Sequence, residues 1–482
     1  MKAEIAKPNP RSTINSYRSF GYNLSTAIAD IIDNSISAGA NEIEIGYKWY
    51  GQDSFIYISD NGIGMNRDEL VIAMTPGSKD PGEERDEKDL GRFGMGLKTA
   101  SFSQCKSLTC ITKKNDYSVI KRCWDIDYIN EANEWQLLDK VSDDSFVKRI
   151  EEKISGTLIL WEKLDRIVGN ANKDNESVKN AFYSEMQTVK SHIGLVFHKF
   201  IESKKVRIVF QEEEVKANNP FLLDLTPMPE MGPTERFGNV EITYFILPHM
   251  SEIGKIPYEK SGGSLGWFQQ QGFYVYRGDR LLVGGDWLGL AKKKDYSKLA
   301  RIMVNFSNSN DFDWNLDIKK STATPPIEIR RELAKHANIA IKKSAKIYNW
   351  RGQVNRETIV PEKSIELLWN DEKNRDGIKK YKINKSHPII KELLKHENKL
   401  LKKALKLIEE NVPIELILSN QNEDPGFHEL EKNDDIPSDD LISLAIELYK
   451  IYISQGLTEN LARQQIMNAT PFNLFPLIEN YL

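Results

Sequence analysis

The sequence has few cysteines, no long apolar run and no strong excess of charge of one sign. Its 482 residues include three cysteines, whose number and spacing exclude a disulfide framework or a zinc site. It has no run of about eighteen apolar residues, so we expect no membrane-spanning helix. The polar segment 1–10 lacks the apolar core of a secretory signal, and we expect a cytoplasmic protein. The net charge of −4 excludes a wholly basic coat for nucleic acid, although a local patch stays open.

The chain does contain a helix-forming segment, residues 24–37, with polar residues at helical spacing. Its isoleucines recur on one face, while Asp30 and Asn34 lie four residues apart and therefore stand side by side. A carboxylate beside a carboxamide can hold a water molecule and a hydrated metal ion. Asp33 could join this patch or point to solvent. Alternatively, the whole patch could be the solvent-exposed face of an amphipathic helix.

Two glycine-containing segments follow. The first reads FIYISDNGIGM, a strand pattern that ends at Asp60 and in a turn where Gly62 and Gly64 let the backbone approach a flat ligand. The second reads LGRFGMGLKTAS, and such a turn before a helix presents N–H groups to a polyphosphate. It is not a P-loop, because Leu97 stands where that motif needs lysine. Together, in this order, the three segments indicate a nucleotide site.

These motifs resemble those of the GHKL ATPases, the superfamily of DNA gyrase, the large heat-shock chaperones, histidine kinases and the mismatch-repair ATPases. Asp30 and Asn34 are similar to its Glu-x-x-x-Asn helix, and Asp60 to the start of its Asp-x-Gly-x-Gly box. IIDNS, DNGIGM and GRFGMGLKTAS look most like the Microrchidia (MORC) type and its prokaryotic relatives. The resemblance implies an α/β architecture: a Bergerat-type α/β sandwich ATPase domain, an α+β, S5-like transducer domain and a helical C-terminal region.

The resemblance also implies a role for each site residue. Asp30 would act as general base, Asn34 would hold Mg²⁺, and Asp60 would accept a hydrogen bond from the adenine amine, which favours ATP over GTP. Lys320 would reach the γ-phosphate, with Lys319 as the alternative, unless both are plain surface lysines. The other cofactor-binding residues would contact the nucleotide or cradle its phosphates: Gly62, Gly64, Met65, Gly91, Gly94, Gly96, Leu97, Lys98 and Thr157.

Two positions depart from the family pattern. The family's base is usually glutamate, and Asp30 is shorter by one methylene, so an attacking water would need a different position. Ser37 stands where the family often has aspartate. Both changes are compatible with nucleotide binding, but they bear on the rate of hydrolysis. A non-hydrolysing ATP-sensing module is therefore one alternative function.

The resemblance, together with changes in composition along the chain, implies three domains. Residues 1–170 form the ATP-binding domain, with an N-terminal arm and an acidic segment, 75–90, that serves as a lid or as a plain solvated loop. Residues 171–330 form the transducer domain, and residues 331–482 the helical region with an acidic linker at 420–440.

Within the transducer domain, three patterns predict secondary structure. Residues 176–201 have a long helical pattern, and VRIVFQEEEVKANNPF reads as a hairpin. Residues 271–287 alternate around Gly-Asp, which predicts a second hairpin that carries Arg277 and Arg280.

A lysine-rich segment, Lys391–Lys406, bears on partners. Five of its lysines, at three- and four-residue spacing, form one helical stripe, the lysine stripe, which could contact duplex DNA or be an ordinary solvated face: Lys391, Lys395, Lys399, Lys402 and Lys406. The resemblance implies a slow, Mg²⁺-dependent ATPase that closes its lid on ATP, forms a homodimer and acts as a DNA-associated clamp, in an anti-phage or restriction system. The alternative is a chaperone-like ATPase for protein clients, and a partner effector protein is compatible with either. We expect no histidine kinase, because no helix with a phosphoacceptor histidine precedes the motifs.

Overall fold

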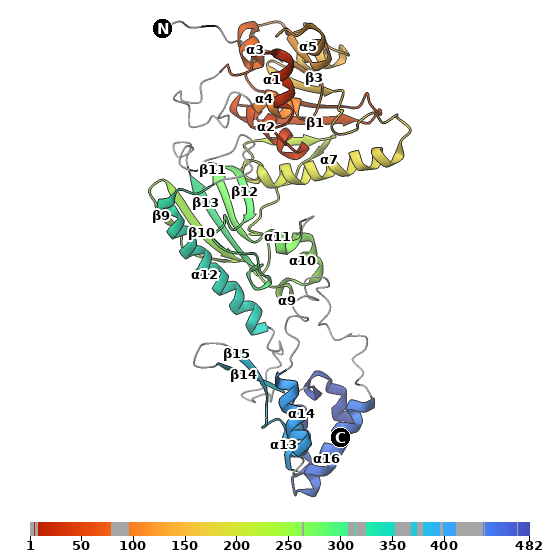
Figure 1. Ribbon diagram of the computed structural model, residues 1–482, viewed down its shortest axis with the longest axis vertical. Coiled ribbons are helices and arrows are strands. Elements are labelled where there is room, and N and C mark those ends of the chain that lie inside the picture. Colours follow the sequence, from red (N-terminus) through yellow and green to blue (C-terminus); the bar gives the residue numbers. More distant parts are fainter. Residues whose placement is uncertain are drawn as a thin grey trace. The chain divides into compact units, whose positions relative to one another are not determined.

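The computed structural model describes most of the chain. The described residues are 4, 8–78, 96–262, 265–306, 314, 324–351, 368–373, 379–395, 399–410, 437, 439–469 and 471–482. The chain divides into two compact units, residues 1–355 and 356–482. The first unit holds two β-sheets, each with its own hydrophobic core (Figure 1).

The first sheet has seven strands among the described residues, in the order β4-β3-β5-β2-β1-β6-β7. The strands are β1 (Glu42–Lys48), β2 (Phe55–Asp60), β3 (Ser107–Lys113), β4 (Ile120–Asp125), β5 (Gly156–Glu162), β6 (Arg207–Phe210) and β7 (Glu213–Glu214). Neighbours are antiparallel except β1 and β6, which run parallel. The predicted hairpin β6–β7 thus exists, but it extends the first sheet and not the second, because β6 pairs with β1.

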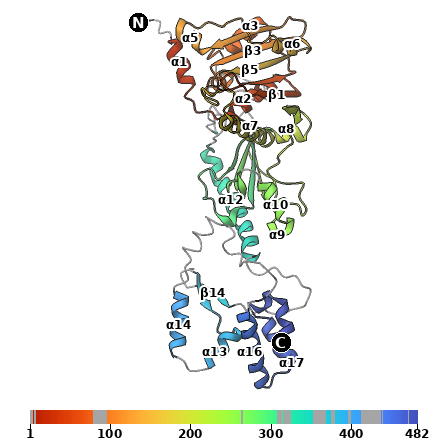
Figure 2. The same cartoon turned by 90° about the vertical axis from the view of Figure 1, so that its right-hand side faces the viewer.

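Helices cover both faces of this sheet. The main core holds α2 (Leu24–Ser37), α4 (Gly96–Phe102) and α7 (Glu176–Val196). Ile28, Ile31 and Ile32 of α2 are buried in it, as their spacing predicts. The smaller core on the other face holds Phe146 and Ile150 of α6 (Ser145–Glu151). Figure 2 shows α1 (Pro10–Tyr17) and α6 on opposite faces of the sheet. The predicted α/β sandwich is confirmed. The remaining helices of this layer are α3 (Arg67–Met74), α5 (Ile126–Ala132) and α8 (His198–Glu202).

The segment before α2 is a packed helix, α1 (Pro10–Tyr17), where the sequence predicts an arm. The Asn9 side chain caps it, and Ile14 is buried in the first core. After the helix, Arg18 donates to the carbonyl of Cys105 over 3.0 Å and pairs with Asp165 over 2.5 Å. These contacts hold residues 10–18 against their own domain.

The second sheet has six strands among the described residues, in the order β12-β11-β13-β10-β8, with β9 paired to β10. The strands are β8 (Glu230–Met231), β9 (Glu235–Phe237), β10 (Val240–Ile246), β11 (Gly272–Arg277), β12 (Arg280–Asp286) and β13 (Ala300–Phe306). The predicted hairpin is confirmed as β11 and β12, which turn at Gly278-Asp279. Short helices flank the sheet: α9 (Met250–Ile253), α10 (Lys255–Gly262), α11 (Gly266–Gln269) and η1 (Asp295–Ser297).

A long helix, α12 (Ile327–Arg351), completes the second core. Its Leu333, Ala337 and Ala340 are buried there with residues of β10 and β13. The predicted boundary after residue 330 therefore falls inside α12. The part of the chain that packs with the second sheet continues into this helix. The apolar face of α12 needs the sheet as its partner, which explains the later boundary.

The second unit combines helices with a hairpin that the sequence pattern did not predict. Its elements are β14 (Trp369–Lys373), β15 (Lys379–Ile383), α13 (Pro388–Lys395), α14 (Lys399–Glu410), α16 (Asp439–Ser454), α17 (Glu459–Met467), η3 (Phe472–Leu474) and η4 (Pro476–Tyr481). Thr458 is the N-cap residue of α17. Most of the predicted acidic linker lies outside the described residues.

The lysine stripe is divided between two helices and is not one line on a single helix. Lys391 and Lys395 lie on α13, while Lys399, Lys402 and Lys406 lie on α14. The two helices pack differently: Ile389 of α13 contacts the core of α16 and α17, whereas α14 contacts β15. Different packing partners explain why one repeating pattern forms two elements.

Two predictions from composition, on membrane-spanning helices and on the cysteines, can be compared with the described residues. Among the helices that the structure describes, none has the length and apolar content needed to cross a membrane. The three cysteines are free thiols, and all are buried, which raises the pKa of each.

Candidate functional site

The site is built on α2, and its first charged residue is Asp30. The side chain of Asn23 caps the helix by accepting from the Thr26 N–H over 2.8 Å. Asp30 is 2% exposed, and the Tyr22 hydroxyl donates to its Oδ2 over 2.8 Å. Gly96, the first residue of α4, lies beside the same oxygen, since a Cβ added there would be 3.7 Å from it. Asp30 thus stands where α2 meets the segment predicted to cradle phosphates.

The other two polar residues predicted for this patch, Asn34 and Asp33, lie in different environments. Asn34 is exposed one turn after Asp30. Asp33 neither joins the patch nor points to solvent, because its Oδ1 accepts from Nε of Arg280 on β12 over 3.2 Å, inside the protein. Sequence spacing could not reveal this partner, which lies 247 residues away.

Asp60 ends β2 and is held by three hydrogen bonds. Its Oδ1 accepts from the backbone N–H groups of Gly62 (2.9 Å) and Thr157 (3.1 Å). Its Oδ2 accepts from the hydroxyl of Ser35 over 2.8 Å. Because Ser35 follows Asn34 on α2, this bond brings the second motif against the first. Sequence reasoning missed Ser35, although its position next to Asn34 was a usable signal.

The environment of Asp60 changes its acidity. The residue is 5% exposed, and this burial raises its pKa above the ordinary value of 3.8, while the hydrogen bonds and the Lys153 ammonium act in the opposite direction. The Lys153 Nζ donates to the Ser59 hydroxyl over 2.9 Å and to the Asp60 carbonyl over 3.0 Å. Asp60 therefore loses its charge at a higher pH than an exposed aspartate does.

The predicted glycines are required by contacts within the chain. Gly64 has φ +64°, and a Cβ there would lie 1.9 Å from the carbonyl oxygen of Lys113. A Cβ on Gly62 would lie 2.9 Å from the carbonyl oxygen of Ala38. Close packing of the turn against its own domain explains both glycines, in addition to the predicted approach of a ligand.

Met65 and Thr157 meet through a third residue. The Met65 N–H donates to Oγ1 of Thr112 over 3.0 Å, and that hydroxyl lies 3.0 Å from Oγ1 of Thr157. Thr112 on β3 was not predicted as a site residue. It joins the turn after β2 to the start of β5, and so places Thr157 against Asp60.

The segment after the lid has a described part and an undescribed part. Lys98 is buried, and its Nζ donates to the carbonyl of Ala73 at the end of α3 over 2.9 Å. Leu97 is half-buried against the first core. These contacts join α4 to α3 and to the core. Several predicted site residues lie outside the described residues, namely Gly91, Gly94, Lys319, Lys320 and the lid after residue 78.

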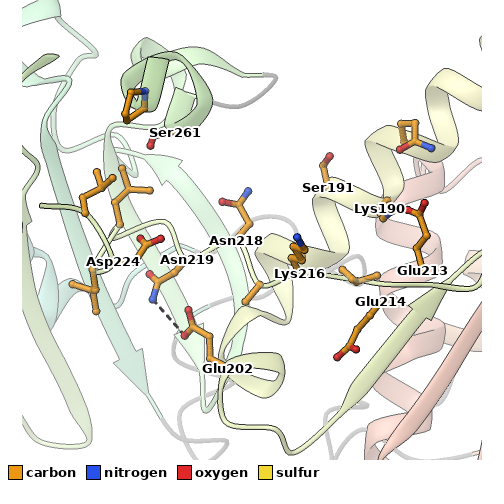
Figure 3. A pocket seen from close by; sticks show the side chains of 18 of the residues that line it. Lys190, Ser191, Glu202, Glu213, Glu214, Lys216, Asn218, Asn219, Asp224 and Ser261 are labelled. Carbon is orange, nitrogen blue, oxygen red and sulfur yellow. Dashed lines mark hydrogen bonds and ion pairs between the residues drawn. The ribbon is translucent and has the colours of Figure 1, made fainter. Parts of the chain in front are cut away.

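A cavity of about 1600 Å³ lies apart from these residues, between α7, the loop after β7, and α10 (Figure 3). Several of its charged groups already have partners: Lys190 pairs with Glu213 over 2.5 Å, and Glu202 accepts from Nδ2 of Asn219 over 3.4 Å. None of the predicted site residues that the structure describes lines this cavity. This cavity and the described residues of the sequence motifs are therefore separate features.

Comparison with known proteins gives short but specific matches. ATPase morc-1 of Caenorhabditis elegans is 32% identical over 90 residues, which are 19% of this chain and 10% of that protein. DNA mismatch repair protein MutL of Fervidobacterium nodosum is 40% identical over 52 residues, 11% of this chain and 9% of that protein. DNA mismatch repair protein PMS1 of Saccharomyces cerevisiae is 54% identical over 43 residues, 9% of this chain and 5% of that protein. The matches thus span a tenth or less of each of these relatives.

Among solved structures, the ATPase and transducer domains of DNA topoisomerase II from Balamuthia mandrillaris align with a TM-score of 0.39 and 11% identity. That alignment covers 69% of this chain and 86% of the other. A family model, described as histidine kinase-, DNA gyrase B-, and HSP90-like ATPase, matches residues 22–157. This range runs from Tyr22 to Thr157 and so includes Asp30, Asn34 and Asp60. Residues 22–157 therefore form a domain of the GHKL family, the histidine kinase-, DNA gyrase B- and HSP90-like ATPases.

Proposed function

We propose that this protein binds ATP with Mg²⁺ and hydrolyses it. The observation that carries the proposal is the buried Asp60 carboxylate. A carboxylate has about four acceptor positions, and Ser35, Gly62 and Thr157 use three of them. The remaining position suits the exocyclic amine of adenine, whereas guanine would place a carbonyl oxygen against the carboxylate. The fixed geometry therefore favours ATP over GTP.

The residues of α2 fit the other end of the nucleotide. Mg²⁺ usually takes one or two protein oxygen ligands and completes its shell with waters and phosphate oxygens, so the exposed Asn34 amide is a sufficient ligand. Mg²⁺ held there would neutralise phosphate charge. Asp30, whose carboxylate is oriented by Tyr22, would orient or deprotonate the attacking water.

Replacing Asp60 tests this assignment. Asp60→Asn should weaken ATP binding by about 1–3 kcal/mol, or roughly 5- to 150-fold, because the charged acceptor is lost. Only the ionised carboxylate accepts without donating, so wild-type affinity should fall as the pH drops through the raised pKa of Asp60, and the variant should lack this component. Isothermal titration calorimetry with ATP and GTP across pH measures both effects. Asp53→Asn, at an exposed position before β2, is the control, and unchanged affinity in Asp60→Asn would refute the adenine contact.

We further propose that ATP closes the predicted lid and transducer and drives homodimerisation. The support is that the second sheet contacts α2 directly through Arg280, and that β13 of this sheet precedes the segment with Lys320. Lys320→Ala should bind ATP and remain in the ADP-like oligomeric state, with Lys319→Ala as the matched control. Sedimentation with ADP and with a non-hydrolysable ATP analogue measures this. Identical mass distributions of the wild type in both nucleotides would contradict gating.

The proposed partner of the closed form is duplex DNA. Two of the similar proteins are DNA mismatch repair proteins by name, and the second unit carries the lysine stripe on α13 and α14. A chaperone-like ATPase for protein clients is the alternative, since lysine faces are often merely solvated. The anti-phage or restriction setting and the effector partner stay predictions.

A further inference from the structure

A buried ion pair joins α2, the helix of Asp30 and Asn34, to the second sheet. Asp33 on α2 and Arg280 on β12 have side chains that are 0% and 5% exposed. The Arg280 guanidinium is also held by its own strand, because Nη1 donates to the Leu281 carbonyl over 2.6 Å, and it lies 5.8 Å from the ring centre of Phe197. Arg280 is therefore bound both to Asp33 of α2 and to its own strand, so it connects the position of α2 to that of β12.

A third element, α7, lies beside this pair. Burial, and secondly the charge of Arg280, lower the pKa of His192 to about 4, so this histidine is neutral near pH 7. The neutral ring adds no second cation next to Arg280. The helix α7 contacts both α2 and β12. The ion pair of Asp33 and Arg280 therefore lies where α2, α7 and β12 meet.

Another ion pair of the same hairpin differs in exposure. Asp279, which precedes Arg280, pairs with Lys205 over 2.6 Å, but these side chains are 37% and 59% exposed. Exposed pairs contribute little because water screens them, whereas a buried charge that loses its partner is strongly unfavourable. The connection between α2 and the second sheet should thus depend on Asp33 and Arg280 and not on the exposed pair.

We propose that Asp33 and Arg280 are positioning residues that transmit the nucleotide state from α2 to the second sheet. Asp33 directly precedes Asn34 and lies one turn from Asp30, so a movement of α2 toward bound phosphate also moves Asp33. Arg280 follows, and with it β12, its neighbour β11, and β13 beyond. This inference rests on the proposed ATP binding and names its means of regulation.

Hydrogen–deuterium exchange of the full chain tests the proposal. In the wild type, a non-hydrolysable ATP analogue should lower exchange in α2 and change exchange in β12 and β13 relative to ADP. Arg280→Met should still bind the analogue and protect α2, but the change in β12 and β13 should be lost. Arg280→Lys keeps the cation and should restore part of that change. Lys205→Met removes the exposed pair and should behave as wild type.

Variants that leave one charge buried could fail to fold, so the double variant Asp33→Asn/Arg280→Met removes both charges together. It should melt in one cooperative transition, bind the analogue and lack the response in β12 and β13. A wild-type response in the folded double variant would overturn this inference while ATP binding stands. Failure of the wild type itself to bind the analogue would instead overturn the proposed function.

Discussion

Asp30→Asn is expected to bind ATP almost as tightly as the wild type and to lose turnover by about 10²- to 10⁴-fold. The amide has nearly the shape of the carboxylate, and its oxygen can still accept from the Tyr22 hydroxyl, which lies 2.8 Å from Oδ2 in the wild type. It cannot take a proton from water. Calorimetric binding of ATP and single-turnover release of phosphate, measured on the same preparations, separate the two effects.

Tyr22→Phe provides a graded comparison for this experiment. It removes the hydroxyl that orients Asp30 and leaves the carboxylate as the base, so its loss of turnover should be smaller than that of Asp30→Asn. Equal rates for the wild type and Asp30→Asn would remove Asp30 from the chemistry. Tight ATP binding by a wild type that releases no phosphate would support the non-hydrolysing sensor, since the shorter Asp30 replaces the family's usual glutamate.

A second large effect is expected in DNA binding. Each phosphate that a lysine neutralises releases a counterion, so contacts from four lysines predict a slope of about 3–4 in a plot of log affinity against log salt. Such a slope amounts to roughly a hundredfold loss of affinity between about 50 and 200 mM salt. The quadruple variant replaces four lysines of the stripe by glutamine: Lys391, Lys395, Lys399 and Lys402. It should lose most of this slope and keep its basal ATPase activity. Little sequence preference is expected, because lysine contacts to phosphate do not read bases.

The division of the stripe into two helices sharpens this test. Replacing only Lys391 and Lys395 on α13, or only Lys399 and Lys402 on α14, should each remove about half of the slope if both helices contact DNA. A charge-matched control in the first unit is the glutamine replacement of four exposed lysines: Lys48, Lys173, Lys204 and Lys216. Wild-type DNA binding by the quadruple variant would make the stripe a solvated face. Absence of DNA binding by the wild type with ATP would favour the protein-client alternative.

Much of the site follows from local sequence. The four-residue spacing of Asp30 and Asn34 places them on neighbouring turns of a helix whatever surrounds it, and the isoleucines between them determine which face is buried. Asp60 at the end of β2 and the glycine turn after it are likewise properties of a short segment. The family motifs are recognisable for the same reason.

Contacts between distant segments were decided only by the tertiary structure. The partners of Asp60 on α2 and β5 lie 25 and 97 residues away, and the partner of Asp33 lies 247 residues away. No periodicity extends over such separations, because these contacts depend on how strands pair and how helices pack on them. Strand pairing and helix packing also explain why β6–β7 belongs to the first sheet and why α12 belongs to the second core. They likewise explain why the lysine stripe is divided between two helices. Local spacing thus indicated the candidate residues for the proposed chemistry, whereas packing determined that Asp33 joins α2 to the second sheet.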